Sequence, residues 1–428
     1  MQLFYVNYVF YVVNYFFGNP FQYFCCYFSK AFTLASMKST FLIPLLLILS
    51  ACCLQKTARR SNNDAPFTFK KRTIHVNFHP HNSIRYKDYL IIQGKDDKEN
   101  FCFEVYDLKT GKTDSTFYQQ IALDSIHGFM IRNERLMACS TSDKWKVWNK
   151  NRWQATQSYS DFFFSQQIKQ EYSQMLKFLH EDATYFVYGV SLGEFGGAAF
   201  FYHKPSGKTY SFQMDTPADI LRTKEGYELS NSVPHGSGFV SLVTIRDPLK
   251  LELVPDKLNF LKHEFGKEAF RLVYDFWKSN EQRNLSFRLV FKQFSMDELA
   301  FESEVYEQYH SLLKQDPNID FKLDTIGMNN LFLCYGSFDF KGKTTYLIQD
   351  SILYLGQMEK GKLKRIQDFP EQTELPYFTT TIEHKKDHNS YSLWFFRGYK
   401  DHGLTVRHVW LSVSGTTIYR YNIVQDLE

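Results

Sequence analysis

The sequence of 428 residues has little of what several common classes of protein require. Its formal net charge is only +4, which gives no reason to expect a nucleic acid partner. Its 7 cysteines show no zinc-ligand spacing. No phosphate-binding glycine loop, dinucleotide fingerprint or kinase signature occurs. We therefore expect no nucleic acid partner, no bound cofactor and no nucleotide chemistry.

Charge is almost absent from residues 1–36, where Lys30 is the one charged side chain. Phe, Tyr and Asn crowd this stretch, and all three have AT-rich codons. We interpret residues 1–36 as a non-native extension, translated from AT-rich DNA upstream of a true start at Met37, and exclude it from the fold. The alternative is a membrane segment over residues 4–17, but its asparagines and its short length make it a poor one.

Residues 37–51 have the layout of a secretory signal peptide, with Lys38 before an apolar stretch over residues 41–49. The apolar core is roughly 9 to 13 residues long, which is too short for a permanent helix across ~30 Å of hydrocarbon. Its last residues, LSAC at 49–52, resemble the lipobox of bacterial lipoproteins, and the resemblance implies that Cys52 is lipidated. The alternatives are an ordinary signal peptide with an incidental cysteine, or a short uncleaved anchor.

The residues that follow Cys52 indicate where the anchor lies. Cys53 stands in place of the aspartate of an inner-membrane retention signal, so the resemblance implies an outer-membrane lipoprotein of the cell envelope. Residues 52–66 are polar and are expected to form a flexible tether. They carry Arg59 and Arg60 rather than an acidic run, which favours a periplasm-facing domain held at the membrane by its lipid anchor.

Beyond the tether, residues 67–428 alternate short runs of aromatic and β-branched residues with polar residues and turns. This alternation is typical of antiparallel strands. Turns near residues 110, 150 and 206 are spaced roughly 40 to 55 residues apart, close to the length of one propeller blade. We predict an all-β fold, a β-propeller of about six or seven blades with a few helical insertions; the alternative is a pair of β-sandwiches. Strands are expected over 89–93, 101–108, 128–140, 144–148, 185–191, 198–202, 209–212, 331–340, 344–348 and 353–358.

Three longer segments place apolar residues at helical spacing. They cover residues 161–182, 256–278 and 296–314. The aromatic stripes in these segments predict packing faces rather than cofactor sites. We expect three helical insertions that cover part of the propeller.

Two sets of polar residues are candidates for chemistry. His75, His79 and His81 would lie on one face of an extended strand, where three imidazoles could hold a metal ion. Pro80 breaks that strand and no carboxylate accompanies the histidines, so a polar surface edge is the favoured interpretation and no metal is expected. A pair of carboxylates at a propeller mouth could hydrolyse glycosides. The candidates are Glu194, Asp215, Asp219, Asp247, Asp275 and Asp339, and the sequence does not show which of them converge.

Taken together, the lipobox, the Phe- and Tyr-rich strands and the blade-like spacing resemble the six-bladed β-propeller lipoproteins of Bacteroidetes. Residues 281–294 are faintly similar to a recurring segment of that family, with Leu285 where the family has proline. The resemblance implies an envelope location and a binding role without an assigned enzymatic activity.

We therefore expect a membrane-anchored binding or scaffold module for a glycan, a peptide or an envelope protein, with no covalent chemistry. The alternative function is a glycoside hydrolase or related hydrolase on the same scaffold. Binding would rest on exposed aromatic side chains. The candidates are Trp145, Trp148, Trp153, Tyr399 and Trp410.

Overall fold

The computed structural model divides the chain into two units, Met1–Asp64 and Ala65–Glu428, and describes residues of the second unit only. The segments predicted as extension and signal peptide lie outside the described residues, as do Cys52, the tether up to residue 64 and the helix predicted over 296–314. The described ranges are 65–142, 144–168, 175–191, 197–214, 216–233, 239–266, 268–269, 271–273, 275–276, 316–326, 332–350, 352–370, 375–384, 389–397 and 405–426.

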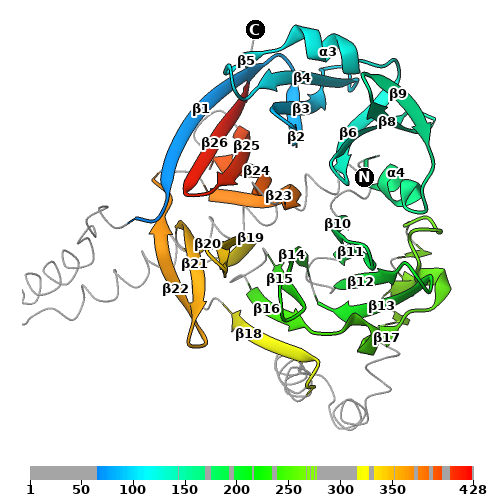
Figure 1. Cartoon of the computed structure of the whole chain (residues 1–428), viewed down its shortest axis with the longest axis vertical. Coiled ribbons are helices and arrows are strands. Elements are labelled where there is room, and N and C mark those ends of the chain that lie inside the picture. Colours follow the sequence, from blue (N-terminus) through cyan, green and yellow to red (C-terminus); the bar gives the residue numbers. More distant parts are fainter. Residues whose placement is uncertain are drawn as a thin grey trace, which may run out of the picture. The chain divides into compact units, whose positions relative to one another are not determined.

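Six sheets follow one another along the described part of the chain, and Figure 1 shows them in turn around a common centre. This arrangement is a six-bladed β-propeller, which confirms the predicted all-β fold and excludes the pair of sandwiches.

Blade 1 contains β2 (His79–Tyr86), β3 (Tyr89–Lys95), β4 (Phe101–Asp107) and β5 (Lys112–Thr113). Blade 2 contains β6 (Ile126–Arg132), β7 (Arg135–Ser140), β8 (Trp145–Asn149) and β9 (Arg152–Thr156). Blade 3 contains β10 (Leu176–Glu181), β11 (Tyr185–Ser191), β12 (Gly197–His203), β13 (Lys208–Gln213) and the short β17 (Glu252–Leu253).

The other three blades complete the ring. Blade 4 contains β14 (Pro217–Arg222), β15 (Tyr227–Val233), β16 (Phe239–Ile245) and β18 (Ile319–Ile326). Blade 5 contains β19 (Leu333–Phe340), β20 (Lys343–Gln349), β21 (Leu353–Glu359) and β22 (Lys362–Asp368). Blade 6 contains β23 (Leu375–His384), β24 (Asn389–Arg397), β25 (Thr405–Ser414) and β26 (Thr417–Gln425), with β1 (Thr68–Val76) as a fifth strand.

Tight turns join successive strands within the blades, as the sequence predicts. Lys360 and Gly361 connect β21 to β22 with φ values of 52° and 72°, the left-handed pair that a two-residue type I′ hairpin turn needs. Lys150 and Asn151 do the same between β8 and β9, with φ values of 48° and 58°.

The N-terminal strand closes the ring. β1 pairs in parallel with β26, from Thr68 beside Thr417 to Val76 beside Gln425. β1 then leads directly into β2, the first strand of blade 1. The first and last blades are thus joined by backbone hydrogen bonds, and the N–H of Asp426 adds one more to the carbonyl of Val76 at 2.8 Å.

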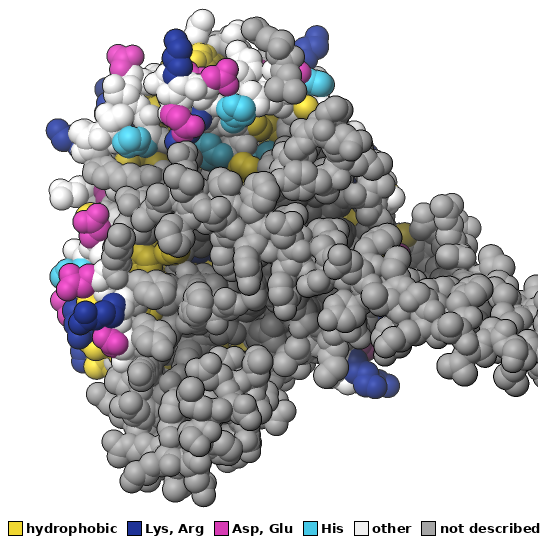
Figure 2. All heavy atoms as spheres, turned by 180° about the vertical axis from the view of Figure 1, so that it is seen from behind, with side chains coloured by type: hydrophobic (Ala, Val, Ile, Leu, Met, Phe, Trp, Pro, Cys, Tyr) yellow, Lys and Arg dark blue, Asp and Glu magenta, His cyan; other side chains and the backbone are white. Residues whose placement is uncertain are grey.

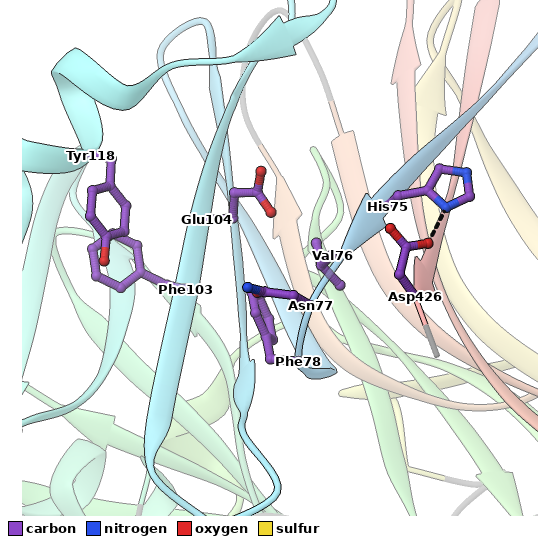
Figure 3. Close-up of a pocket in the computed structure, with 8 residues that line it drawn as sticks. All are labelled: His75, Val76, Asn77, Phe78, Phe103, Glu104, Tyr118 and Asp426. Carbon is purple, nitrogen blue, oxygen red and sulfur yellow. Dashed lines mark hydrogen bonds and ion pairs between the residues drawn. The ribbon is translucent and has the colours of Figure 1, made fainter. Parts of the chain in front are cut away.

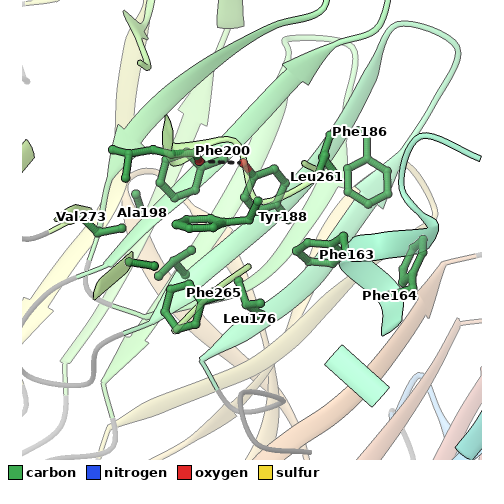
Figure 4. Packing of buried hydrophobic residues seen from close by; sticks show 14 of the residues in the cluster. Phe163, Phe164, Leu176, Phe186, Tyr188, Ala198, Phe200, Leu261, Phe265 and Val273 are labelled. Atoms are coloured by element: carbon green, nitrogen blue, oxygen red, sulfur yellow. Dashed lines mark hydrogen bonds between the residues drawn. The ribbon is translucent and has the colours of Figure 1, made fainter. Parts of the chain in front are cut away.

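The core consists of clusters at the junctions between neighbouring blades. In the described part, buried apolar side chains form six such clusters, one at each junction. Figure 4 shows the cluster between blades 2 and 3, where Tyr188 and Phe200 stack at 5.1 Å and Phe163 packs beside them. Full burial of such a ring contributes about 1.5–3 kcal/mol, so each junction is held mainly by the hydrophobic effect.

Polar side chains of second strands add directional bonds across the same junctions. The amide of Gln93 on β3 accepts from the N–H of Phe129 on β6 at 2.6 Å and donates to its carbonyl at 3.1 Å. Ser392 on β24 accepts from the N–H of Ser83 on β2 at 3.2 Å. These bonds fix the inner strands relative to one another.

Helices are shorter than the sequence predicts. The segment 161–182 contains α4 (Asp161–Ile168), but its second half forms the inner strand β10, because Leu176 and Leu179 are buried between blades. The insertion over 256–278 lies between β16 and β18; it contains the 3₁₀ turn η6 (Asp256–Leu258), and its described residues among 268–276 are helical. A second 3₁₀ turn, η5 (Pro248–Lys250), precedes β17.

Two further elements differ from the prediction. The strand expected over 128–140 is a hairpin of β6 and β7, whose turn residues Asn133 and Glu134 have φ values of 47° and 61°. The helix α3 (Ser115–Ile121) has no counterpart in the prediction, and Asp114 caps it by accepting from the N–H of Phe117 at 2.8 Å.

The surface of the described part carries charges of both signs. Figure 2 shows acidic and basic side chains interspersed over the part of the rear face that the structure describes. None of the described helices combines the length and the apolarity that a membrane crossing requires.

Candidate functional site

The aromatic residues expected to bind a ligand are mostly part of the core. Trp145, Trp148 and Trp410 are 2%, 7% and 1% exposed, so the expectation that they lie on the surface is wrong. Trp145 is fixed there because its indole N–H donates to the carbonyl of Asp161 and the hydroxyl of Ser165, both at 2.9 Å. Burial of its apolar body with its N–H satisfied outweighs any gain from exposure.

The remaining two aromatic candidates differ. Trp153 is partly buried; its ring lies 5.2 Å from that of Trp148, and its N–H donates to the carbonyl of Ile121 at 3.2 Å. Tyr399 lies outside the described residues. The four described residues therefore do not form a shared exposed surface that could bind a ligand.

The three histidines do not converge on a metal site. His75 hydrogen-bonds Asp426 at 2.6 Å, whereas His79 hydrogen-bonds Asp97 at 3.1 Å. Burial and the charge of Lys95 lower the pKa of His81 to about 4, so it is neutral at pH 7. Among the described residues, no group of three or more histidine, cysteine, aspartate or glutamate side chains could hold a metal ion.

The inner strands bring together a polar group that we call the axial cluster: Lys177, Asp219, Ser337 and His384. Asp219 on β14 is 1% exposed, and its carboxylate accepts from the N–H and hydroxyl of Ser337 on β19 at 2.7 and 3.0 Å. Its other oxygen lies 2.9 Å from Nε2 of His384 on β23. Three successive inner strands are therefore joined through one carboxylate.

The protonation states in the axial cluster follow from these contacts. Burial by itself would raise the pKa of Asp219, but the charge and hydrogen bond of His384 hold that pKa below its usual value. Burial opposes protonation of His384 too, yet Asp219 raises its pKa, and Asn389 Oδ1 lies 3.0 Å from the other ring nitrogen. Burial lowers the pKa of Lys177 to about 8, while Asp219 limits the fall. Asp219 therefore favours the protonated, charged forms of both His384 and Lys177.

This geometry does not form an activated nucleophile. The Ser337 hydroxyl bonds to Asp219, and both nitrogens of His384 face oxygen acceptors other than that hydroxyl. An imidazole that accepts the serine proton is the feature that activates serine in hydrolases. The cluster therefore acts as a structural link between blades.

The six carboxylates proposed for glycoside hydrolysis do not form a visible pair. Glu194 and Asp215 lie outside the described residues. The other four are engaged separately. Asp219 lies in the axial cluster, Asp247 caps η5, Asp275 pairs with Arg271 at 3.6 Å, and the exposed Asp339 accepts from the N–H of Gly342 at 3.2 Å.

A groove of about 420 Å³ lies where blade 6 meets blade 1, and we call it the closure groove. Figure 3 shows Tyr118 and Phe103 at one end, the hydrogen-bonded His75 and Asp426 at the other, and Glu104 between them. Its lining comes from the end of β1, the link to β2, strand β4, helix α3 and the residue after β26. The lining residues are His75, Val76, Asn77, Phe78, Phe103, Glu104, Tyr118 and Asp426.

Packing beneath the groove depends on one glycine. Phe78 is 3% exposed and lies against Gly94 of β3. A Cβ at Gly94 would stand 2.4 Å from the Phe78 ring and 2.2 Å from the carbonyl of His79. No larger residue fits there without moving the floor of the groove.

The side chains around the groove leave ligand-binding groups uncovered. Tyr118 is 39% exposed and stacks on Phe103 with 4.6 Å between ring centroids. Burial and the nearby Asp426 raise the pKa of Glu104, and among the described residues Glu104 has no hydrogen-bond or ion-pair partner. The groove therefore offers an aromatic face at one end and a carboxylate nearer its middle, both of which can contact a ligand.

Sequence reasoning did not identify this groove, apart from His75. Tyr118 follows from a helix that the sequence did not predict, and Asp426 reaches the groove only because the ring closes. Glu104 gave a usable signal, since it is the one charged side chain between Phe101 and Tyr106 in an otherwise apolar strand.

No protein-family model matches the sequence, and no curated protein matches it. Among solved structures, the chain is similar to the computationally designed Ika8 protein, with 7% identity, a TM-score of 0.31 and 82% of this chain and 98% of that chain covered. It is also similar to the β-propeller domain of the Trilobed protease from Pyrococcus furiosus, with 8% identity, a TM-score of 0.29 and coverages of 77% and 98%. A mutant Aleuria aurantia lectin in complex with α-methyl-L-fucoside aligns with 10% identity, a TM-score of 0.28 and coverages of 77% and 93%. The propeller assignment rests on the six sheets of this chain itself.

Proposed function

We propose that the protein is a non-catalytic binding or scaffold module of the cell envelope, which holds a glycan, a peptide or another envelope protein. The observation that carries this proposal is the closure groove, which is lined by the partly exposed Tyr118 and by the carboxylate of Glu104, for which the described residues supply no partner. Aromatic faces and polar groups on a rigid scaffold are what recognition requires.

The state of the buried polar groups supports binding over catalysis. Asp219 is engaged with both His384 and Ser337, so neither Asp219 nor His384 is positioned to take a proton from the Ser337 hydroxyl and activate it.

The location is part of the same proposal. The lipobox-like sequence ending at Cys52 supports a lipid anchor in the outer membrane, and the basic residues of the tether support a periplasm-facing propeller. The tether would let the closure groove reach partners near the membrane surface.

A combined binding and turnover assay tests the proposal. Full-length protein in detergent is mixed with a panel of polysaccharides, chromogenic glycosides and peptides, and both complex formation and product release are measured. We expect binding of at least one class without turnover. Sustained hydrolysis that disappears when one carboxylate is replaced would establish the glycoside hydrolase instead.

A further inference from the structure

Blade 1 differs from the other blades at its outer edge. Its fourth strand, β5, has 2 residues and pairs only with Tyr106 and Asp107 of β4. The fourth strands β9, β13, β22 and β26 have 5, 6, 7 and 9 residues. The first half of β4 therefore lacks the neighbour that completes a blade.

In this half of β4, the N–H and carbonyl groups of alternate residues point away from β3. In an antiparallel pair, a residue directs both its N–H and its carbonyl to the same side. The carbonyl of Val105 accepts from the N–H of Asp114 at 2.8 Å, on the side away from β3. By the same alternation, the N–H and carbonyl of Phe103 face that side, and neither has a hydrogen-bond partner there among the described residues.

The side chains at this edge differ between the two faces of β4. Figure 3 shows Phe103 and Tyr118 on one side of the strand and Glu104 on the other, toward Asp426. A strand added beside β4 would place alternate side chains over these two surfaces. One face would accept an apolar side chain, and the other would accept a cation that compensates Glu104.

We propose that the outer edge of β4 binds an extended peptide segment of a partner protein as an added strand, with a lysine or arginine side chain placed over Glu104 and Asp426. The free backbone groups of Phe103 supply the pairing, and the two carboxylates supply the charge complementarity. This inference rests on the proposed binding function and names its partner class.

A matched set of probe peptides tests the inference. The reference probe is a fluorescent, capped peptide of the sequence Lys-Val-Thr-Val-Thr, whose lysine would lie opposite Glu104 and whose remaining residues would run antiparallel to the open half of β4, away from β5. A second probe has glutamate in place of lysine, and a third carries an N-methyl group on the valine opposite Phe103. We expect full-length protein to bind the reference probe at least tenfold more tightly than either of the others, by fluorescence anisotropy.

Two protein variants test whether Glu104 causes the preference for the lysine probe. Glu104→Gln should remove most of the preference for lysine over glutamate, whereas Glu359→Gln, which removes an exposed carboxylate of blade 5, should leave it unchanged. Equal affinity for the lysine and glutamate probes, or undiminished binding of the N-methylated probe, would overturn the inference.

The result also separates this inference from the general function. Binding of a glycan with no binding of any probe peptide overturns the peptide assignment and leaves the binding function standing. Failure to bind any glycan or peptide overturns both.

Discussion

At the scale of single residues, Asp219 of blade 4 hydrogen-bonds Ser337 of blade 5 and His384 of blade 6. Replacement by asparagine would leave the buried charges of His384 and Lys177 without their counter-ion. Removing one partner of a buried ion pair costs about 3–5 kcal/mol. We therefore predict that Asp219→Asn lowers the free energy of unfolding by about that amount, measured by urea denaturation followed by tryptophan fluorescence.

Asp339→Asn is the matched control, because Asp339 is exposed and accepts a single turn hydrogen bond. Its effect should stay within about 1 kcal/mol. Equal effects of the two substitutions would show that the axial cluster contributes nothing particular to stability.

The buried side chain of His408 should make the stability of the protein depend on pH. It is 2% exposed and its Nε2 lies 2.8 Å from the Ser392 hydroxyl. Burial, and secondarily the neighbouring His81, lowers the pKa of His408 to about 3. Because this pKa lies below the unfolded value near 6.5, the stability contribution is complete above pH 6.5 and is lost as the pH falls toward 3.

The measurement for His408 is the slope of unfolding free energy between pH 4 and 6. His408→Gln should reduce this slope by up to about 1.4 kcal/mol per pH unit, the value for one proton. His81 has its pKa lowered to about 4, so part of the slope should remain in that variant. An unchanged slope would mean that His408 is not held neutral by burial.

At the scale of elements, β1 is the strand on which closure of the ring depends. Ile74 is 4% exposed and packs in the cluster between blades 6 and 1. Truncation of a buried isoleucine costs about 2–5 kcal/mol. Ile74→Ala should therefore lower the unfolding midpoint in urea clearly, whereas Thr73→Ala, at an exposed position of the same strand, should change it little. Equal midpoints would argue that β1 is not needed for closure.

Local patterns predicted strands better than helices, for a physical reason. Alternation and turn residues are local, and the hairpins over residues 344–358 and 198–212 appear where the sequence placed them. In residues 161–182, Leu176 and Leu179 fit both a helical and a strand pattern. The segment forms a strand because both leucines are buried between blades. A local sequence pattern cannot predict burial that depends on the closed ring.

The candidate sites were less predictable because their residues are distant in sequence. His384 and Asp219 are separated by 165 positions, and His75 and Asp426 by 351. Only the closed ring brings each pair together. The prediction that the tryptophans are exposed was wrong for a different reason. Large aromatic side chains contribute most to stability when they are buried.

At the scale of the whole molecule, we propose that Cys52 carries a lipid anchor that tethers the propeller to a membrane. Cells grown with labelled palmitate should incorporate label into the wild-type protein and into Cys53→Ala, but not into Cys52→Ala. Label that persists in Cys52→Ala, or that never enters the wild type, would refute the lipid anchor at Cys52.

We propose that the propeller holds a ligand in the closure groove and leaves it chemically unchanged. Hydrogen–deuterium exchange of the full-length protein, with and without the lysine-containing probe peptide, tests this most directly. We expect slower exchange in β4 and α3, little change in blades 3 to 5, and a probe of unaltered mass. Protection confined to other blades, or a cleaved probe, would contradict it.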